Sequence, residues 1–81
     1  DFWAEWCGPC RAVGPILEQI DGETDKLDVV KVNVDENPDL AMRYGITSIP
    51  AMKVFVGGEV RKELIGAKPK AALEADLAAF L

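Results

Sequence analysis

The sequence predicts an α/β fold in which helices flank a mixed parallel and antiparallel sheet. A short apolar segment, an amphipathic segment and a β-branched segment follow one another within residues 1–34, which predicts two parallel strands joined by a right-handed helical crossover. Two further strand-like segments flank Gly57-Gly58, the spacing of a tight antiparallel hairpin. With a short helix before the hairpin and a longer one after it, the expected order is βαβ-α-ββα.

The first strand is expected over Asp1–Ala4 and is short. A helix is expected to begin at the two cysteines that follow, because Pro9 stands where a first-turn proline is tolerated and apolar residues then recur at helical spacing. These apolar positions are Val13, Ile16, Leu17 and Ile20. Pro15 lies within this helix and lacks an amide hydrogen, so we expect the helix to bend there.

The second strand is expected over Val29–Val34, a β-branched run that ends at a polar turn. Asn37 is a favourable N-cap residue, and Pro38 after it suits the first position of a helix. This short helix should end near Tyr44, because Gly45 can adopt the left-handed conformation that stops a helix.

Glycine and proline delimit the hairpin and the last helix. Strands over Met52–Val56 and Glu59–Ile65 flank the two turn glycines, and Gly66 ends the second strand. Pro69 then opens a final helix. Its apolar face is formed by Ala72, Leu73, Ala75 and Leu77, with Phe80 or Leu81.

Composition and charge narrow the classes of function. The 81 residues suffice for one domain, and 49% of them are hydrophobic, as in ordinary globular proteins. The net charge of −5 would repel phosphate backbones and anionic lipid surfaces, so neither nucleic acid nor a membrane is an expected partner. The chain has no histidine, which excludes an imidazole base, a histidine-bound metal and an axial haem histidine from its own chemistry.

Cys7 and Cys10 are the only cysteines, a usage that fits a reducing compartment better than a secreted scaffold stapled by disulfides. Two cysteines three residues apart at a helix start lie on one face within bonding distance, so they can form and open a disulfide without moving the backbone. The amide groups of the first helical turn converge at Cys7 and would stabilise its thiolate. We therefore expect an exposed Cys7 to attack a substrate disulfide and a shielded Cys10 to resolve the mixed disulfide.

Other uses of two cysteines at this spacing are open on the residues alone. A zinc site needs four ligands and would require a dimer, because the chain has no third cysteine and no histidine. Haem attachment needs a histidine after the second cysteine, where Arg11 stands. A purely structural disulfide would close too short a loop to restrict the unfolded chain much. The acidic runs Asp35-Glu36 and Glu23–Asp25 are interpreted as solvated turns without chemistry.

The residues around the cysteines resemble a known active site. Trp6-Cys7-Gly8-Pro9-Cys10, preceded by Asp1-Phe2-Trp3-Ala4, is similar nearly residue for residue to the active site of the thioredoxin family. The similarity continues through further segments: Pro15, Lys31-Val32-Asn33-Val34-Asp35, Tyr44-Gly45-Ile46, Ser48-Ile49-Pro50, Gly57-Gly58-Glu59 and Gly66. It covers essentially all 81 residues and implies a thioredoxin-like fold. Because the family's initial strand and helix have no counterpart, we expect a single thioredoxin-like domain over residues 1–81 that is truncated at its N-terminus.

The resemblance also implies an activity, that of a dithiol-disulfide oxidoreductase that reduces protein disulfides. It implies no bound cofactor, only a redox-active disulfide between Cys7 and Cys10, with electrons from NADPH supplied by the flavoprotein thioredoxin reductase. The expected partners are this reductase and protein disulfide substrates, and the expected state is a cytoplasmic monomer. Gly8-Pro9 resembles the reducing members of the family. A disulfide isomerase or oxidase, or a binding module in which the thiols are incidental, stays open as an alternative.

The resemblance assigns roles to residues around the cysteines. Asp1 is similar to the family's buried acid, which is thought to move the proton of Cys10, and Lys31 to a lysine that pairs with this acid. Ile49-Pro50 resembles a cis-proline turn that offers its backbone to an extended peptide. The apolar rim expected to bind substrate consists of Trp6, Gly8, Pro9, Ile49, Pro50, Gly66 and Ala67.

Overall fold

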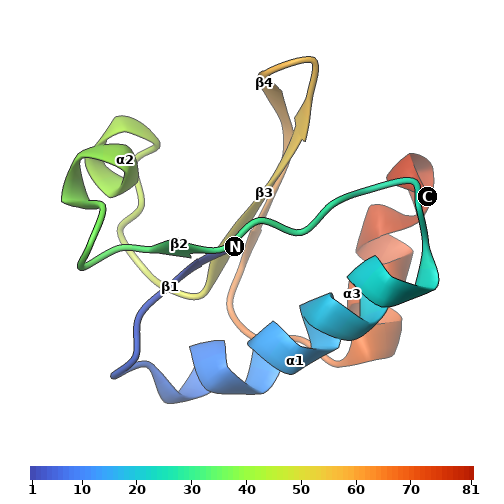
Figure 1. Cartoon of the computed structure of the whole chain (residues 1–81), viewed down its shortest axis with the longest axis horizontal. Helices are drawn as coiled ribbons and strands as arrows, with labels where there is room; N and C mark the ends of the chain where they lie inside the picture. The colour runs from blue at the N-terminus through green and yellow to red at the C-terminus, as the bar shows by residue number, and fades with distance from the viewer.

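The computed structural model describes residues 1–81 and contains one four-stranded sheet with helices beside it (Figure 1). In chain order the elements are β1 (Phe2–Trp3), α1 (Gly8–Glu23), β2 (Val32–Asn33), α2 (Pro38–Arg43), β3 (Ala51–Val56), β4 (Glu59–Ile65), α3 (Lys70–Leu77) and the 3-10 turn η1 (Ala78–Phe80). The strand order across the sheet is β2-β1-β3-β4. β1 runs parallel to β2, whereas β3 is antiparallel to both β1 and β4. The predicted mixed sheet and the order of its elements are confirmed.

The parallel pair β1–β2 is shorter than predicted. Two residues of each strand are paired, in a register that places Phe2 opposite Val32. The prediction of a strand over the whole of Val29–Val34 is therefore wrong for its first half. The Val32 amide donates to the Asp1 carbonyl (2.8 Å) and the Asp1 amino group donates to the Val30 carbonyl (2.8 Å), but residues 29–31 are not in strand conformation.

The hairpin β3–β4 forms as predicted. Val56 pairs with Glu59 across the two-residue turn. The turn residues Gly57 and Gly58 have φ values of +60° and +83°, left-handed conformations that glycine adopts without the steric cost of a Cβ. The hairpin projects away from the end of the sheet at which α1 begins (Figure 1).

Helices α1 and α3 pack against the sheet and enclose the main core. This core comprises seven side chains that are at most 7% exposed: Val13, Leu17, Ile20, Met52, Leu64, Leu73 and Leu77. They come from both helices and from β3 and β4. The apolar side chains that recur at helical spacing and those that alternate along the strands therefore point into the same layer. None of the helices is long and apolar enough to cross a membrane.

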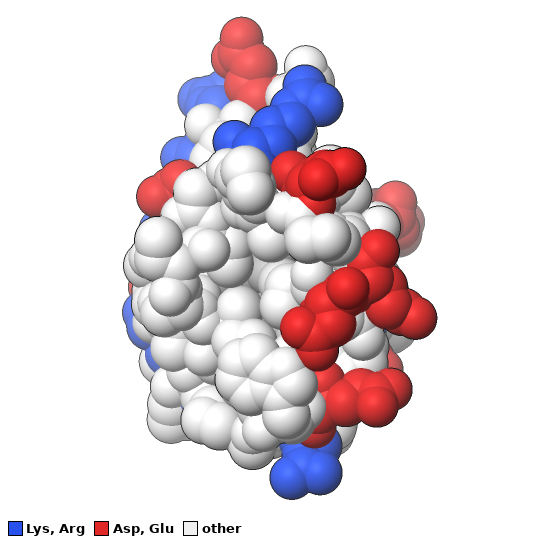
Figure 2. All heavy atoms as spheres, turned by 90° about the vertical axis from the view of Figure 1, so that its left-hand side faces the viewer, with Lys and Arg blue, Asp and Glu red and all other residues white.

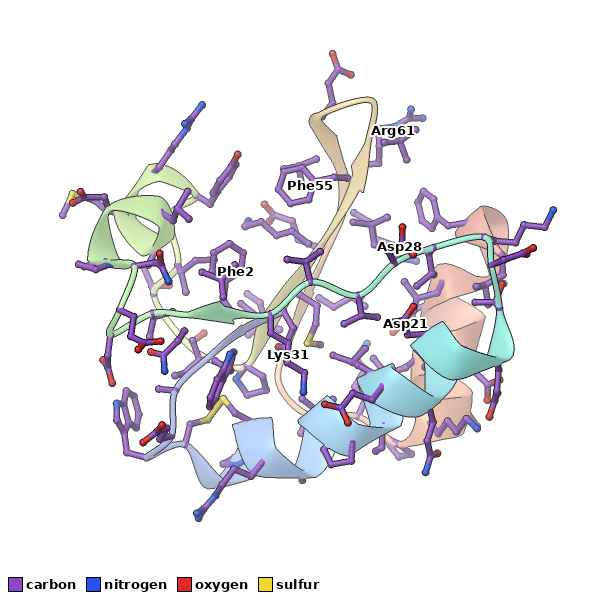
Figure 3. The ribbon with its side chains drawn as sticks, viewed as in Figure 1. Phe2, Asp21, Asp28, Lys31, Phe55 and Arg61 are labelled. Atoms are coloured by element: carbon purple, nitrogen blue, oxygen red, sulfur yellow. A yellow bond between two sulfur atoms is a disulfide. The ribbon has the colours of Figure 1, made fainter.

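The opposite face of the sheet is more open. Phe2 of β1, Tyr44 after α2 and Phe55 of β3 form a row, with ring centroids 6.2 Å apart in the first pair and 5.4 Å in the second. A groove of about 890 Å³, lined mostly by apolar residues, lies at the edge of the sheet between residues 26–32 and β3, and it reaches both faces, because Leu17 and Met52 of the main core line it as well as Phe2 and Phe55. Phe55, labelled with Phe2 in Figure 3, is 43% exposed beside it.

The turn before α2 is organised by Asn33 and not by Asn37. The sequence predicts Asn37 as the N-cap of α2, but its side chain caps no helix amide and donates instead to the Asn33 carbonyl (3.1 Å). The Asn33 Oδ1 accepts the backbone amides of Asp35 (2.9 Å) and Glu36 (3.3 Å). Asn37 is the N-cap residue of α2 as predicted, but it makes no side-chain capping bond, because its side chain is used within the turn, which holds Asp35 and Glu36 in place beside β2.

Candidate active site

The two cysteines form a disulfide at the start of α1, seen as the yellow bond in Figure 3. Their Cα atoms are 5.2 Å apart. Cys7 is the N-cap residue of α1, and its amide donates to the Ala4 carbonyl (3.1 Å), which closes the turn between β1 and the helix. The amide of Cys10 donates to Cys7 Sγ (3.2 Å). Cys7 is thus the sulfur that receives a hydrogen bond from the helix N-terminus.

Both cysteines are buried. Cys7 is 5% exposed and Cys10 is 3% exposed, so the prediction of an exposed Cys7 beside a shielded Cys10 is wrong for this disulfide form. The side chains that enclose the pair are Ala4, Trp3, Val34 and Ile49. The sequence could not show this enclosure, because it is built by residues from β1, the end of β2 and the loop before β3. The two sulfurs are almost equally buried, and they differ in that Cys7 Sγ accepts a hydrogen bond from the Cys10 amide.

The loop before β3 meets the disulfide. The Ile49–Pro50 peptide bond is cis, as the resemblance implies. Ile49 packs against the cysteine cluster, and the buried Pro50 accepts a hydrogen bond at its carbonyl from the Gly66 amide (2.8 Å). Of the predicted rim, Ile49 therefore lies against the cysteines, and Pro50, the next residue, is bonded to Gly66.

The remaining residues of the predicted rim are exposed. Gly8 and Pro9 lie between the cysteines, Ala67 follows Gly66, and Trp6 precedes Cys7 with 69% of its surface exposed. Figure 2 views the molecule from the side on which α2 and the start of α1 lie. That face is largely uncharged at its centre and carries carboxylates along one side.

One contact beside the disulfide was not predicted. Trp6 Nε1 donates to Asp35 Oδ2 (2.9 Å), which joins the loop after β1 to the loop after β2. From the sequence, Asp35 is expected to be part of a solvated turn. A signal was available, because parallel strands end at the same edge of a sheet, so residues directly after two adjacent parallel strands are expected to be neighbours.

Asp1 lies at the start of β1, on the same side of the strand as Trp3 two residues later. The Oδ1 atom of Asp1 and the Nε1 atom of Trp3 are buried and have no hydrogen-bond partner. Because Trp3 packs against the cysteine cluster, the Asp1 carboxyl lies on the cysteine side of the strand. Asp1 also lines the groove, so it lies between the two regions.

Lys31 does not pair with Asp1, and that expectation is wrong. Lys31 Nζ forms an ion pair with Glu18 of α1, and Asp1 takes part in none of the ion pairs of the chain. Figure 3 shows Lys31 directed from the segment before β2 toward α1. A Cβ at Gly14 would lie 3.4 Å from Lys31 Nζ. The Lys31 side chain therefore passes α1 at Gly14 to reach Glu18. The position of Lys31 in the sequence does not reveal this contact.

The arrangement supports exchange between a dithiol and a disulfide, and no three His, Cys, Asp or Glu side chains are grouped to bind a metal ion. The fold and the cysteine pair at the start of α1 define the class of thiol-disulfide oxidoreductases. The family model described as Thioredoxin matches residues 1–79. The chain belongs to the thioredoxin family.

Similar proteins agree with this assignment. The chain is 56% identical over 73 residues to the thioredoxin of Streptomyces clavuligerus, covering 90% of this chain and 68% of that protein. It is 51% identical over 78 residues to the bifunctional thioredoxin reductase/thioredoxin of Mycobacterium leprae, covering 95% of this chain and 17% of that protein. A solved mutant thioredoxin from Halobacterium salinarum matches with a TM-score of 0.91 and 38% identity, covering 99% of this chain and 70% of that one. The predicted thioredoxin-like fold is confirmed.

Proposed function

We propose that the protein reduces the disulfides of other proteins, with Cys7 as the attacking sulfur and Cys10 as the resolving sulfur. The hydrogen bond from the Cys10 amide to Cys7 Sγ (3.2 Å) carries this assignment. A helix N-terminus stabilises negative charge, so the sulfur that accepts its amide hydrogen bond is the one favoured as a thiolate. The thiolate is the form that attacks disulfides.

In the proposed cycle, the reduced protein begins with Cys7 as a thiolate and Cys10 as a thiol. Cys7 Sγ attacks one sulfur of the substrate disulfide, that bond breaks, and the leaving sulfur takes up a proton from solvent. Cys10 then loses its proton and attacks Cys7 Sγ, which closes the Cys7–Cys10 bond and releases the second substrate sulfur as a thiolate. This thiolate takes up the proton that Cys10 lost, so the substrate gains two electrons and two protons, one of them from Cys10 and one from solvent.

Asp1 is proposed as the group that accepts the Cys10 proton. Its Oδ1 is buried on the cysteine side of β1 without a hydrogen-bond partner, which leaves an acceptor free. A positioned carboxylate can act as a general base when it lies within reach of the proton, directly or through one water. Lys31, paired with Glu18, takes no part in this mechanism.

The proposed docking surface is the rim around Cys7. Trp6, Gly8 and Pro9 supply exposed surface on one side of the disulfide, and Ile49 with Pro50 lies against it on the other. An extended substrate segment would bind there through main-chain hydrogen bonds and apolar contact, a mode that is largely independent of sequence. Gly66 and Ala67 complete the rim, since the Gly66 amide is held by the Pro50 carbonyl.

The proposal assigns the return of electrons to a thioredoxin reductase that uses NADPH. The relative from Mycobacterium leprae supports this pairing, because its name joins a thioredoxin reductase and a thioredoxin in one protein. The proposal places the protein in the cytoplasm as a monomer. The use of its only two cysteines as the redox pair supports a reducing compartment.

A trapping experiment tests the assignment of the two sulfurs. Reduced Cys10→Ser protein is mixed with insulin, whose disulfides are accessible, and the products are separated without a reductant. We expect a stable mixed disulfide at Cys7 that dithiothreitol releases, because release in the protein needs the second sulfur. Catalytic turnover should fall to the rate without protein.

The matched control is Cys7→Ser, which should trap nothing and should also lose turnover. Continued turnover by Cys10→Ser would show that the resolving sulfur is elsewhere. Trapping through Cys10 in the Cys7→Ser protein would reverse the proposed roles. A Cys7→Ser protein that retained full biological activity would support the binding module in place of the reductase.

A further inference from the structure

We propose that the protein favours substrate disulfides flanked by lysine or arginine, because the loops beside its own disulfide carry carboxylates that form no ion pair. This inference rests on the proposed reductase activity and specifies its substrate class. The residues assigned to the selection are Glu5, Glu36 and Asp39, named here the acidic border.

The acidic border is placed next to the disulfide by the link between two loops. The bond from Trp6 Nε1 to Asp35 Oδ2 (2.9 Å) joins the loop between β1 and α1 to the loop between β2 and α2. Glu5 lies in the first loop, between Ala4 and Trp6. The carbonyl of the buried Ala4 accepts the Cys7 amide and closes the turn. Glu36 lies directly after Asp35 in the second loop. Two of the three border residues are thus in loops that touch beside the cysteines.

The position of the border is fixed by the backbone. The Glu36 amide donates to the buried Asn33 Oδ1 (3.3 Å), in the turn that also presents Asp35. Asp39 follows in the first turn of α2. Because the backbone of this turn is held by several hydrogen bonds, the carboxylates extend into solvent from a defined place.

The carboxylates of the border form no ion pair. Those that do are Glu18, Glu23, Glu63 and Asp76. The nearest basic residues in the sequence are Arg11, directly after Cys10, and Arg43, which lies one turn after Asp39 in α2 and over the Tyr44 ring. Figure 2 shows a face that is uncharged at its centre, with several carboxylates along one side and basic groups at the top and bottom. The border is therefore a local excess of negative charge at the edge of the docking surface.

A substrate that fits this surface combines an accessible disulfide with cationic side chains a few residues away. The uncharged rim supplies the contact area, and charges at the edge of an interface act mainly on the rate of encounter and on discrimination between partners. The Debye length is about 8 Å at physiological salt, so only substrate charges near the disulfide are felt strongly. Lysine or arginine beside the substrate cysteines would be attracted, and glutamate or aspartate there would be repelled.

Three matched peptides test this selection. Each contains one intramolecular disulfide, and they differ only in whether lysine, glutamine or glutamate flanks the cysteines. The second-order rate constant for their reduction by the pre-reduced protein is measured at about 20 mM and about 300 mM salt, which changes the Debye length roughly fourfold. We expect the lysine peptide to react about tenfold faster than the glutamate peptide at low salt, with the ratio approaching one at high salt.

Two variants that remove the same charge locate the effect. In Glu5→Gln/Glu36→Gln/Asp39→Asn, the ratio between lysine and glutamate peptides should fall to about twofold or less. The control is Asp25→Asn/Glu59→Gln/Glu74→Gln, which changes exposed carboxylates after α1, at the hairpin tip and on α3. It should keep the ratio of the unchanged protein. Circular dichroism verifies that both variants are folded.

The outcomes separate this inference from the proposed function. Equal rates for the lysine and glutamate peptides at low salt would overturn the selection and leave the reductase activity standing. The same conclusion would follow if the ratio of the two rates were lost in the control variant and kept in the border variant. Failure to reduce the glutamine peptide would overturn the reductase proposal itself, and the selection with it.

Discussion

The two faces of the sheet differ in how completely the chain covers them. On one face, α1 and α3 enclose seven core side chains that are at most 7% exposed. On the other, Phe2, Tyr44 and Phe55 form an aromatic row in which Phe55 is 43% exposed. The disulfide belongs to the covered face, since it begins α1 and Trp3 packs over it. The chain therefore encloses its disulfide with the face that it covers more completely.

The largest effect is expected from Leu73→Ala on the covered face. Leu73 of α3 is fully buried, so its truncation leaves a cavity under the helix. The free energy of unfolding should fall by about 2 to 5 kcal/mol. Urea denaturation followed by circular dichroism measures the change. A loss below about 1 kcal/mol would show that this face is no better packed than the other.

A smaller effect is expected from Phe55→Ala on the open face, although the side chain removed is larger. Phe55 is 43% exposed and contacts Tyr44 edge to face at 5.4 Å. Partial burial and one aromatic pair together predict a loss of about 1 to 2 kcal/mol. The rate of insulin reduction should stay unchanged. A loss equal to that of Leu73→Ala would remove the difference between the faces.

The smallest effect concerns the side chains that hold α3 over the sheet. Lys68 donates to Asp76 Oδ2 (2.7 Å), and Lys62 Nζ of β4 donates to the Asp76 carbonyl (2.7 Å). The hydrogen bond from Lys68, helped by the charges of Lys68 and Lys62, holds the pKa of Asp76 below its usual range. A lowered pKa stabilises the folded protein at neutral pH, and this contribution is lost as the pH falls through the folded value.

The test is Asp76→Asn, compared with the unchanged protein by urea midpoint from pH 7 to pH 2.5. The variant should be slightly less stable at pH 7, and the difference should shrink as the pH falls below the ordinary aspartate range and vanish once the folded Asp76 is protonated. Glu74→Gln, two residues away and outside every ion pair, is the matched control and should show no such dependence on pH. A difference that grew toward low pH would contradict the assigned sign.

The parts of the fold that were predicted correctly are those that local sequence determines. Gly57-Gly58 specifies a tight turn, and the cysteine pair with the periodic apolar residues after it specifies the start of α1. The length of β2 was not predictable, because a strand is defined by its pairing with another segment, and only Val32 and Asn33 pair with β1. The resemblance to the thioredoxin family supplied the cis bond at Ile49–Pro50, which no local pattern indicates.

The parts of the site that were predictable are those formed by residues close together in the sequence. Cys7 and Cys10 were found because three residues along a helix start bring two sulfurs together. The burial of Cys7, the bond from Trp6 to Asp35 and the pairing of Lys31 were missed. Each of these features depends on contact with a side chain from another helix, strand or loop. Such contacts are set by tertiary packing, which the local sequence does not show.

The pairing of β3 has a consequence for amide hydrogen exchange. All six residues of β3 pair with β4, with a shift of register between Val54 and Phe55, whereas pairing with β1 is limited to Ala51. In a strand, successive amides point to opposite edges, so every second amide of β3 is bonded to β4 and those between face the groove. The protection of backbone amides from hydrogen exchange should therefore alternate along β3. Amides bonded to β4 should exchange when the hairpin opens, and the amides between them should exchange when solvent enters the groove.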